Sequence, residues 1–385
     1  MATERIYLDH AATTPLRAEA QAAMEAHAHD ANPSSIHAEG RRARAALEEA
    51  RATVAAILRC RPKEIVFCGS GTEADNLAVI GTARAARSRG KHVVATAIEH
   101  HAVLRALDVL RQEGFEVTLI PVNARGVIER DAFAAALRAE TVVAAMMYAN
   151  NEIGTIQPVA QCAALARERG ILFVTDAVQA AGALDLDVAK LGVDALAISA
   201  HKFAGPKGAG ALYVREGTPL EPIVYGGGQE RGRRSGTEDV AGAVGLARAF
   251  QLAEAEREMH VTRLAAMRDR FEDAMARTIP GVIVNGQGAA RLPGISSVSF
   301  PGLEAEPLLI ALDLAGIAAS AGSACTTGAL EPSHVIAALG LPPATVKGTL
   351  RFSLGRTTTV AETASVAARL RAIVAAQREG AALSV

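Results

Sequence analysis

The chain of 385 residues contains no tryptophan and only four cysteines, and its formal net charge is −1. A charge this close to zero argues against a surface built mainly to bind nucleic acid. No apolar run approaches the ~20 residues of a membrane-spanning helix, and the segment from Met1 to Asp9 lacks the apolar core of a signal peptide. We therefore expect a soluble, cytoplasmic protein that contacts no membrane and binds no nucleic acid directly.

The few cysteines are Cys60, Cys68, Cys162 and Cys325. They form no Cys-x-x-Cys pair and no Cys/His cluster with zinc spacing, so we expect no intrinsic metal site. For the first three, which fall in or beside predicted helices and strands, a packing role is expected. Cys325 lies among small and polar residues, a composition typical of a loop, where a thiol is accessible for chemistry.

Lysine is also scarce, with six residues against 34 arginines, and this draws attention to Lys202. It follows an apolar run at Val193–Ile198 that predicts a buried strand, and it precedes a loop rich in glycine and proline. An amine can form a Schiff base with an aldehyde, whereas a guanidinium cannot. From this segment alone, a surface lysine at the end of a strand is an equal alternative.

Asp176 follows another apolar strand and lies 26 residues before Lys202, about the length of one crossover connection. If the two strands are parallel, both side chains emerge at the same carboxyl edge of a sheet, where ligands bind. A lysine for an aldehyde and a carboxylate for a ring nitrogen are the pair that pyridoxal phosphate (PLP) requires. The alternative for Asp176 is the N-cap of a helix.

A phosphate site is predicted where the sequence Gly-Ser-Gly-Thr-Glu-Ala, residues 69–74, follows a strand and opens a helix. Small residues let backbone N–H groups converge there, and a helix N-terminus attracts an anion. The segment lacks the ending of a nucleotide P-loop, so an ATP site is not expected. A capped helix start without a ligand is the alternative.

Apolar strands alternate with amphipathic helical stretches from about residue 64 onward, which predicts a mostly parallel sheet with helices on both faces. The predicted strands of this sheet are Ile65–Cys68, His92–Ala97, Val117–Val122, Val142–Tyr148, Ile171–Thr175, Ala195–Ser199 and Ala211–Val214. A long helical tract at Asp239–Arg277 then leads to an α+β segment. We predict a large α/β domain at residues 16–260 and a small α+β domain formed by residues 1–15 and 261–385.

Across nearly its whole length the chain resembles the cysteine desulfurases of the NifS/IscS type, in the class V aminotransferase group of PLP enzymes. The matching segments are Tyr7–Thr14, Gly71–Glu73, Glu99-His100, Asn150–Gly154, Asp176–Gln179, Ser199–Lys202, Gly226–Thr237, Gly322–Thr326, Glu331–His334 and Arg351–Arg356. The resemblance implies the PLP-dependent transferase fold of type I, with a seven-stranded sheet. Position 200 departs from the pattern, since it is alanine where the family usually has glycine.

The resemblance also implies a role for each site residue. Lys202 would bond to the cofactor aldehyde and move protons at the substrate carbon, and His100 would stack on the ring and act in acid–base steps, whereas His101 would be a solvated helix residue. The remaining cofactor ligands would be Asp176, Gln179, Gly71, Thr72, Ser199, His201, Asn151 and, in the partner's site of a homodimer, Thr237. Asn151 and Arg351 would hold the substrate carboxylate, for which a planar guanidinium is well suited.

Cys325 would then be the nucleophile that takes sulfur from L-cysteine, leaving L-alanine and a persulfide. The loop at about residues 319–332 would carry it, with Gly322 and Gly328 as hinges. The persulfide would pass to an iron–sulfur scaffold protein or another acceptor for thio-cofactor synthesis, and Cys325 could share an iron–sulfur ligand role with that partner. The tail at residues 376–385 lacks the family's aromatic ending, which leaves the acceptor open. Selenocysteine lyase or another class V aminotransferase activity is the alternative.

Overall fold

The computed structural model describes residues 5–321 and 333–382, and its main feature is a sheet of seven strands, called the large sheet, in the order β2-β8-β7-β6-β5-β3-β4. Its strands are β2 (Ile65–Cys68), β3 (His92–Thr96), β4 (Glu116–Ile120), β5 (Thr141–Ala145), β6 (Leu172–Asp176), β7 (Ala195–Ser199) and β8 (Gly210–Val214). Strand β8 pairs antiparallel with β2 and β7, whereas the other pairs are parallel. The predicted mostly parallel sheet is confirmed, and each predicted strand overlaps an observed one.

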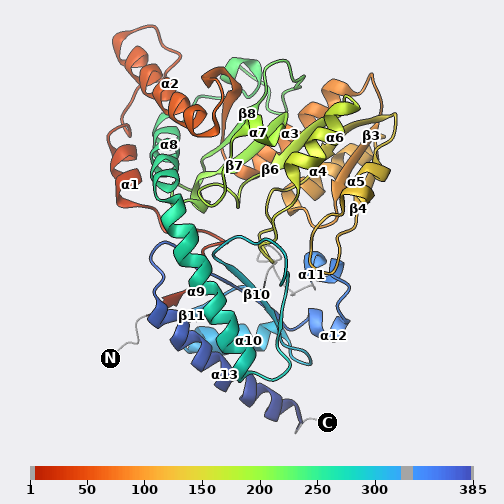
Figure 1. The fold of residues 1–385 in the computed structure, drawn as a ribbon. Helices are drawn as coiled ribbons and strands as arrows, with labels where there is room; N and C mark the ends of the chain where they lie inside the picture. The colour runs from red at the N-terminus through yellow and green to blue at the C-terminus, as the bar shows by residue number, and fades with distance from the viewer. Residues whose placement is uncertain (1–4, 322–332, 383–385) are drawn as a thin grey trace.

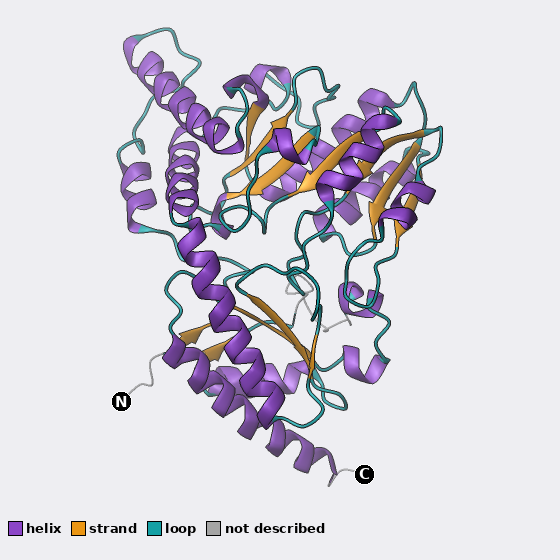
Figure 2. Ribbon diagram, in the orientation of Figure 1, coloured by secondary structure: helices purple, strands orange, loops and turns teal. Residues whose placement is uncertain are grey.

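Helices cover both faces of the large sheet (Figures 1 and 2). Residues of α3 and α4 share one core with the sheet, and residues of α1, α2, α5, α6, α7 and α8 share the other. Neighbouring strand residues such as Val143 and Ala144 therefore enter opposite cores, which explains why these strands are continuous apolar runs. The helices are α1 (Ala18–Glu25), α2 (Ala38–Leu58), α3 (Gly71–Ala86), α4 (His101–Gln112), α5 (Arg130–Ala136), α6 (Val159–Glu168), α7 (Val188–Leu191) and α8 (Val240–Ala255), with short 3-10 turns η1 (Pro62–Glu64), η2 (Ala200–Lys202) and η3 (Glu230–Gly232).

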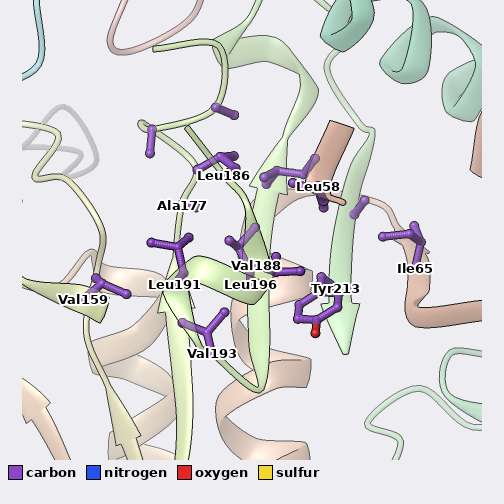
Figure 3. Close-up of a cluster of buried hydrophobic side chains, with 14 of the residues drawn as sticks. Leu58, Ile65, Val159, Ala177, Leu186, Val188, Leu191, Val193, Leu196 and Tyr213 are labelled. Carbon is purple, nitrogen blue, oxygen red and sulfur yellow. The ribbon is translucent and has the colours of Figure 1, made fainter. Parts of the chain in front are cut away.

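Figure 3 shows part of the second core, where Leu196 of β7 and Tyr213 of β8 lie near Val188 and Leu191 of α7. These side chains are almost fully buried, and burial of apolar area at roughly 25 cal/mol per Å² is the main force that holds the layers together. Cys68 and Cys162 are buried in these cores, as expected for packing residues, and Cys60 is partly buried against one.

A second group of elements surrounds a three-stranded antiparallel sheet, called the small sheet, in the order β12-β10-β9. A separate parallel pair joins β1 to β11, so the start of the chain belongs beside this sheet rather than beside the large one. Its elements are β1 (Ile6–Tyr7), α9 (Arg257–Thr278), β9 (Ile283–Val284), β10 (Ile295–Ser299), α10 (Ala305–Leu314), β11 (Ile317–Ala318), α11 (His334–Ala338), α12 (Pro343–Val346), β12 (Thr349–Ser353) and α13 (Val360–Ala382). The proposed domain boundaries at residues 15 and 260 stay a prediction.

The predicted helical tract at Asp239–Arg277 is two helices, because the helix breaks at Glu256. Arg17, which precedes α1, binds both carboxylate oxygens of Glu256 at 3.1 and 2.7 Å, and His260 approaches it at 3.1 Å. Helix α8 packs on the large sheet and α9 on the small sheet (Figure 1). Across residues 5–321 and 333–382, no helix combines the length and apolar character needed to cross a bilayer.

A buried ion pair fixes the edge of the large sheet. Arg51 of α2 donates to both carboxylate oxygens of Glu230, at 2.6 and 2.8 Å, and both side chains are at most 3 % exposed. Glu230 also accepts the backbone N–H of Phe67 in β2 at 3.0 Å, so the pair connects α2, β2 and η3.

We predict that Glu230→Gln lowers the free energy of unfolding by about 3 kcal/mol, because Arg51 loses its buried counter-charge and keeps only the half-exposed carboxylate of Glu48, 3.0 Å from its Nε. Urea unfolding followed by circular dichroism measures this change. The matched control is Asp108→Asn, which removes an exposed partner of Arg105 and Arg111 and should cost no more than about 1 kcal/mol. Equal costs for the two variants would contradict the prediction.

Candidate active site

A cavity of about 460 Å³ opens at the carboxyl ends of β6 and β7, where Asp176 and Ser199 are the last strand residues. Because β6 and β7 pair in parallel, both side chains emerge at one edge of the large sheet. The cavity also reaches the small sheet, since Arg351 of β12 lines it. Ten of the twelve site residues expected from the sequence line it: Gly71, Thr72, His100, Asn151, Asp176, Gln179, Ser199, His201, Lys202 and Arg351.

Lys202 lies in the 3-10 turn after β7, and its amine contacts the chain near the N-terminus. Its Nζ donates to the carbonyl oxygens of Ala11 and Ala12, at 2.7 and 2.9 Å. Gln179 donates from Nε2 to the same Ala11 oxygen at 2.9 Å. Ala11, Gln179 and Lys202 also line a second cavity of about 200 Å³. We place the site in the larger cavity, because Asp176, His100 and the first residues of α3 line it.

Asp176 and His100 influence each other's charge inside the cavity. Burial raises the pKa of Asp176, while His100, the Val178 N–H (2.8 Å from Oδ1) and Lys202 act to lower it. His100 is the N-cap of α4 and accepts the Ala102 N–H on Nδ1 at 3.1 Å. Burial lowers the pKa of His100, and the charge of Asp176 partly opposes that shift. A histidine in this environment is a neutral imidazole near pH 7, able to accept a proton.

The N-terminus of α3 provides backbone donors at one end of the cavity. Ser70 caps the helix by accepting the Glu73 N–H at 3.0 Å. A Cβ at Gly71 would lie 2.9 Å from Val178 Cγ2 and 3.0 Å from Ser199 Cβ, so only glycine fits this close approach. With its helix dipole and free N–H groups, this terminus favours an anion.

His201 lines the same cavity. Burial, Lys202 and Lys207 lower its pKa to about 4, so it is neutral near pH 7, and its Nδ1 lies 3.2 Å from Thr13 Oγ1. Ala200, the position where the family usually has glycine, is fully buried in the core beside the cavity.

Arg351 brings a buried positive charge to the side of the cavity formed by the small sheet. Its guanidinium donates to Asp9 Oδ1 and to the carbonyl oxygen of Asn151, both at 2.9 Å. Its Nε is buried and has no hydrogen-bond partner within the described ranges. Its backbone pairs with Ser320, the last described β-bridge residue before position 322. An unpaired N–H on a buried guanidinium favours an anionic ligand.

Several residues that line the cavity were not assigned roles from the sequence: Asp75, His101, Glu152 and His334. Glu152 accepts the Ser333 hydroxyl at 2.5 Å, and His334 Nε2 lies 3.0 Å from the Glu99 carbonyl oxygen. His101 is a helix residue, as expected, since α4 begins with it; it is half-buried rather than fully solvated, with its ring 5.0 Å from that of His334. The position of Asp75 could have been predicted from the sequence, because it lies four residues after Gly71 and therefore on the same face of the helix.

Two expected residues do not line this cavity. Thr237 lines a smaller hollow of about 130 Å³ together with Cys68, Gly69 and Gly210. Its expected contact with the partner's phosphate site stays a prediction. Cys325, with its expected hinges Gly322 and Gly328, lies outside the described residues.

Comparisons with known proteins agree on one family. Residues 6–366 match the family described as Aminotransferase class-V. A protein named Cysteine desulfurase IscS from Dictyoglomus turgidum is 46 % identical, over 92 % of this chain and 90 % of the relative. Its namesake from Methanosarcina thermophila is also 46 % identical, over 92 % and 88 %.

Solved structures give the same result. One described as a NifS-like protein superposes with a TM-score of 0.90 at 34 % identity, covering 96 % of this chain and 99 % of the other. Another, described as SspA in complex with cysteine, has a TM-score of 0.80 at 34 % identity, covering 91 % and 98 %.

We predict that Asp176→Asn lowers the pKa of His100 further, because the carboxylate charge that opposes the effect of burial is lost. Histidine NMR of the cofactor-free protein across a pH series measures this. Asp108→Asn, an exposed substitution on α4, is the control and should leave the His100 titration in place. A His100 pKa that stays constant or rises in Asp176→Asn would show that the two groups do not interact.

Proposed function

Since this chain belongs to the class V aminotransferase family and is a cysteine desulfurase, we propose that its 460 Å³ cavity binds PLP and L-cysteine side by side. Enzymes of this class use PLP as their cofactor. The observation that carries the proposal is the convergence of an amine, a buried carboxyl group and a helix N-terminus in one cavity: Lys202, Asp176 and the start of α3.

The residues present fit the cofactor. Gly71 lets the N-terminus of α3 lie close against Val178 and Ser199. Its backbone N–H groups would bind the phosphate, with Thr72, Ser199 and His201 lining the same cavity. Asp176 is positioned to hold a proton on the ring nitrogen, and Gln179 to hydrogen-bond the ring hydroxyl. When bound, PLP supplies an electron-withdrawing ring that stabilises negative charge at the substrate carbon.

The protein's own groups then move protons and orient the substrate. Lys202 would hold the cofactor through its amine, and the same amine would serve as a base at the substrate carbon. The neutral imidazole of His100 accepts and returns protons beside it. Arg351 and Asn151 hold the cysteine carboxylate, and the unpaired Nε of Arg351 supports this assignment. The solved structure described as SspA in complex with cysteine supports L-cysteine as the substrate.

Sulfur transfer requires a second thiol, and we assign it to Cys325. Its thiolate attacks the substrate sulfur, so that a sulfur–sulfur bond forms and the carbon–sulfur bond of the substrate breaks. The electron pair of the broken bond stays with the carbon, which takes up a proton to give L-alanine. The sulfur remains on Cys325 as a persulfide, available to an acceptor.

The partners follow from the same proposal. We infer a homodimer in which Thr237 reaches the phosphate of the partner's site, and an acceptor that is an iron–sulfur scaffold protein or another sulfur acceptor. The chain's net charge of −1 supports a protein acceptor over direct binding of nucleic acid. A cytoplasmic location stays a prediction, which fractionation of the producing cells would test.

We predict that Cys325→Ala abolishes persulfide formation and sulfide release from L-cysteine, with retention of bound PLP. The assay measures alanine and sulfide in the presence of a reductant, alongside the visible spectrum of the cofactor. Cys162→Ala, which changes a buried packing cysteine, is the matched control and should retain turnover. Turnover of Cys325→Ala at the wild-type rate would refute the persulfide route and favour selenocysteine lyase or aminotransferase chemistry.

We predict that Lys202→Ala loses both the visible absorption of the lysine-bound cofactor and all turnover, because no other residue replaces its amine. The control is Lys207→Ala, which removes a neighbouring amine that also lines the cavity. If Lys202→Ala keeps measurable turnover while Lys207→Ala loses it, the assignment of the bonding amine is wrong.

A further inference from the structure

Asp75 is a buried acid on the wall of the active-site cavity that the proposed chemistry does not use. It lies in the second turn of α3, is 2 % exposed and lines the cavity together with Asp176. Its Oδ1 is buried without a hydrogen-bond partner among residues 5–321 and 333–382. A buried carboxylate without a counter-charge is strongly unfavourable, so such a group normally keeps its proton.

The elements packed against α3 bring mainly acids to Asp75. Asp176 ends β6, Glu99 precedes α4, and Cys68 lies on β2. Strands β5 and β7 carry no titratable side chain, and Tyr213 of β8 points into the opposite core. The nearby cation Lys202 acts on Asp176, as does His100 when it is protonated. Burial, and then the charges of Asp176 and Glu99, raise the pKa of Asp75 well above its usual range.

We propose that Asp75 is a positioning residue that stays protonated, so that the negative charge of the Asp75–Asp176 pair resides on Asp176. This inference rests on the proposed function, in which the Asp176 carboxylate faces the ring nitrogen. It also explains how an acid is tolerated one turn from the phosphate site at the start of α3. A carboxylate at position 75 would repel a phosphate there, whereas a neutral acid does not.

The first test is infrared spectroscopy of the purified full-length enzyme near pH 7.5. We expect the difference spectrum of wild type minus Asp75→Asn to contain the carbonyl stretch of a protonated carboxylic acid. Glu99→Gln and Glu152→Gln are matched controls, because Glu99 and Glu152 are also buried and have raised pKa values. Loss of carboxylate bands alone in Asp75→Asn would overturn the proposal.

The second test is the pH dependence of urea unfolding of the wild type and of Asp75→Asn. A proton held by native Asp75 is released on unfolding above about pH 4, the usual pKa of an aspartate. Unfolding of the wild type is therefore favoured as the pH rises, and the asparagine variant lacks this contribution. We expect the ratio of unfolding constants, wild type over Asp75→Asn, to increase about tenfold per pH unit between pH 5 and 8. A constant ratio would overturn the proposal.

Other variants cover the remaining outcomes. If Asp75→Asn does not fold, Asp75→Ser replaces it in both tests, since serine is also small, polar and neutral. The visible spectrum of each preparation separates this inference from the proposed function. A wild type that binds no PLP would refute the proposed function, yet the protonation of Asp75 would still be decided by the two tests.

Discussion

The active-site cavity depends on how the segment from Asp9 to Thr14 joins the two sheets. On the side of the small sheet, Asp9 Oδ1 accepts a hydrogen bond from the Arg351 guanidinium, and the Ala11 N–H donates to Ser353 Oγ at 2.8 Å. On the side of the large sheet, the Ala11 carbonyl oxygen accepts hydrogen bonds from Lys202 Nζ and Gln179 Nε2. The Thr14 N–H donates to the His201 carbonyl oxygen at 2.9 Å. These contacts of the segment from Asp9 to Thr14 therefore set the distance between the amine of Lys202 at one wall and the guanidinium of Arg351 at the other. Shifts of about 1 Å in such positions can change rates strongly.

Burial then sets the charge state of each group in that cavity. The charge of Asp176 is supported by Lys202, by the Val178 N–H and by His100 when it is protonated, whereas none of the described residues gives Asp75 such support. At Glu99, hydrogen bonds from Thr96 and the Met147 N–H counteract the effect of burial, and its pKa is raised to about 7. Three acids of similar intrinsic strength thus differ in the groups that oppose the effect of burial, which is how one site can contain both a proton donor and an anion.

Sequence patterns predicted the large sheet well because its strands are continuous apolar runs that end at polar residues. Asp176 and Lys202 could be paired for this reason, since strand order and crossover length place them at one edge. The helix break at Glu256 was not predictable, because it depends on a bidentate contact with Arg17, more than 200 residues earlier in the chain. The roles of Glu152 and His334 were missed for a similar reason: their contacts with Ser333 and Glu99 exist only once α11 packs against the segments that follow β3 and β5.

The imbalance between arginine and lysine has a structural explanation. Arginine binds carboxylates at junctions in bidentate pairs, with the buried Glu230 and Glu272 held by Arg51 and Arg291 and the partly exposed Glu256 held by Arg17. A guanidinium keeps its charge when buried, so these contacts persist across the physiological pH range. An amine loses its proton more readily, which would weaken such junctions but is necessary for a group that bonds an aldehyde and then acts as a base. The use of arginine for architecture therefore leaves Lys202 as an amine whose charge can change without loosening the fold.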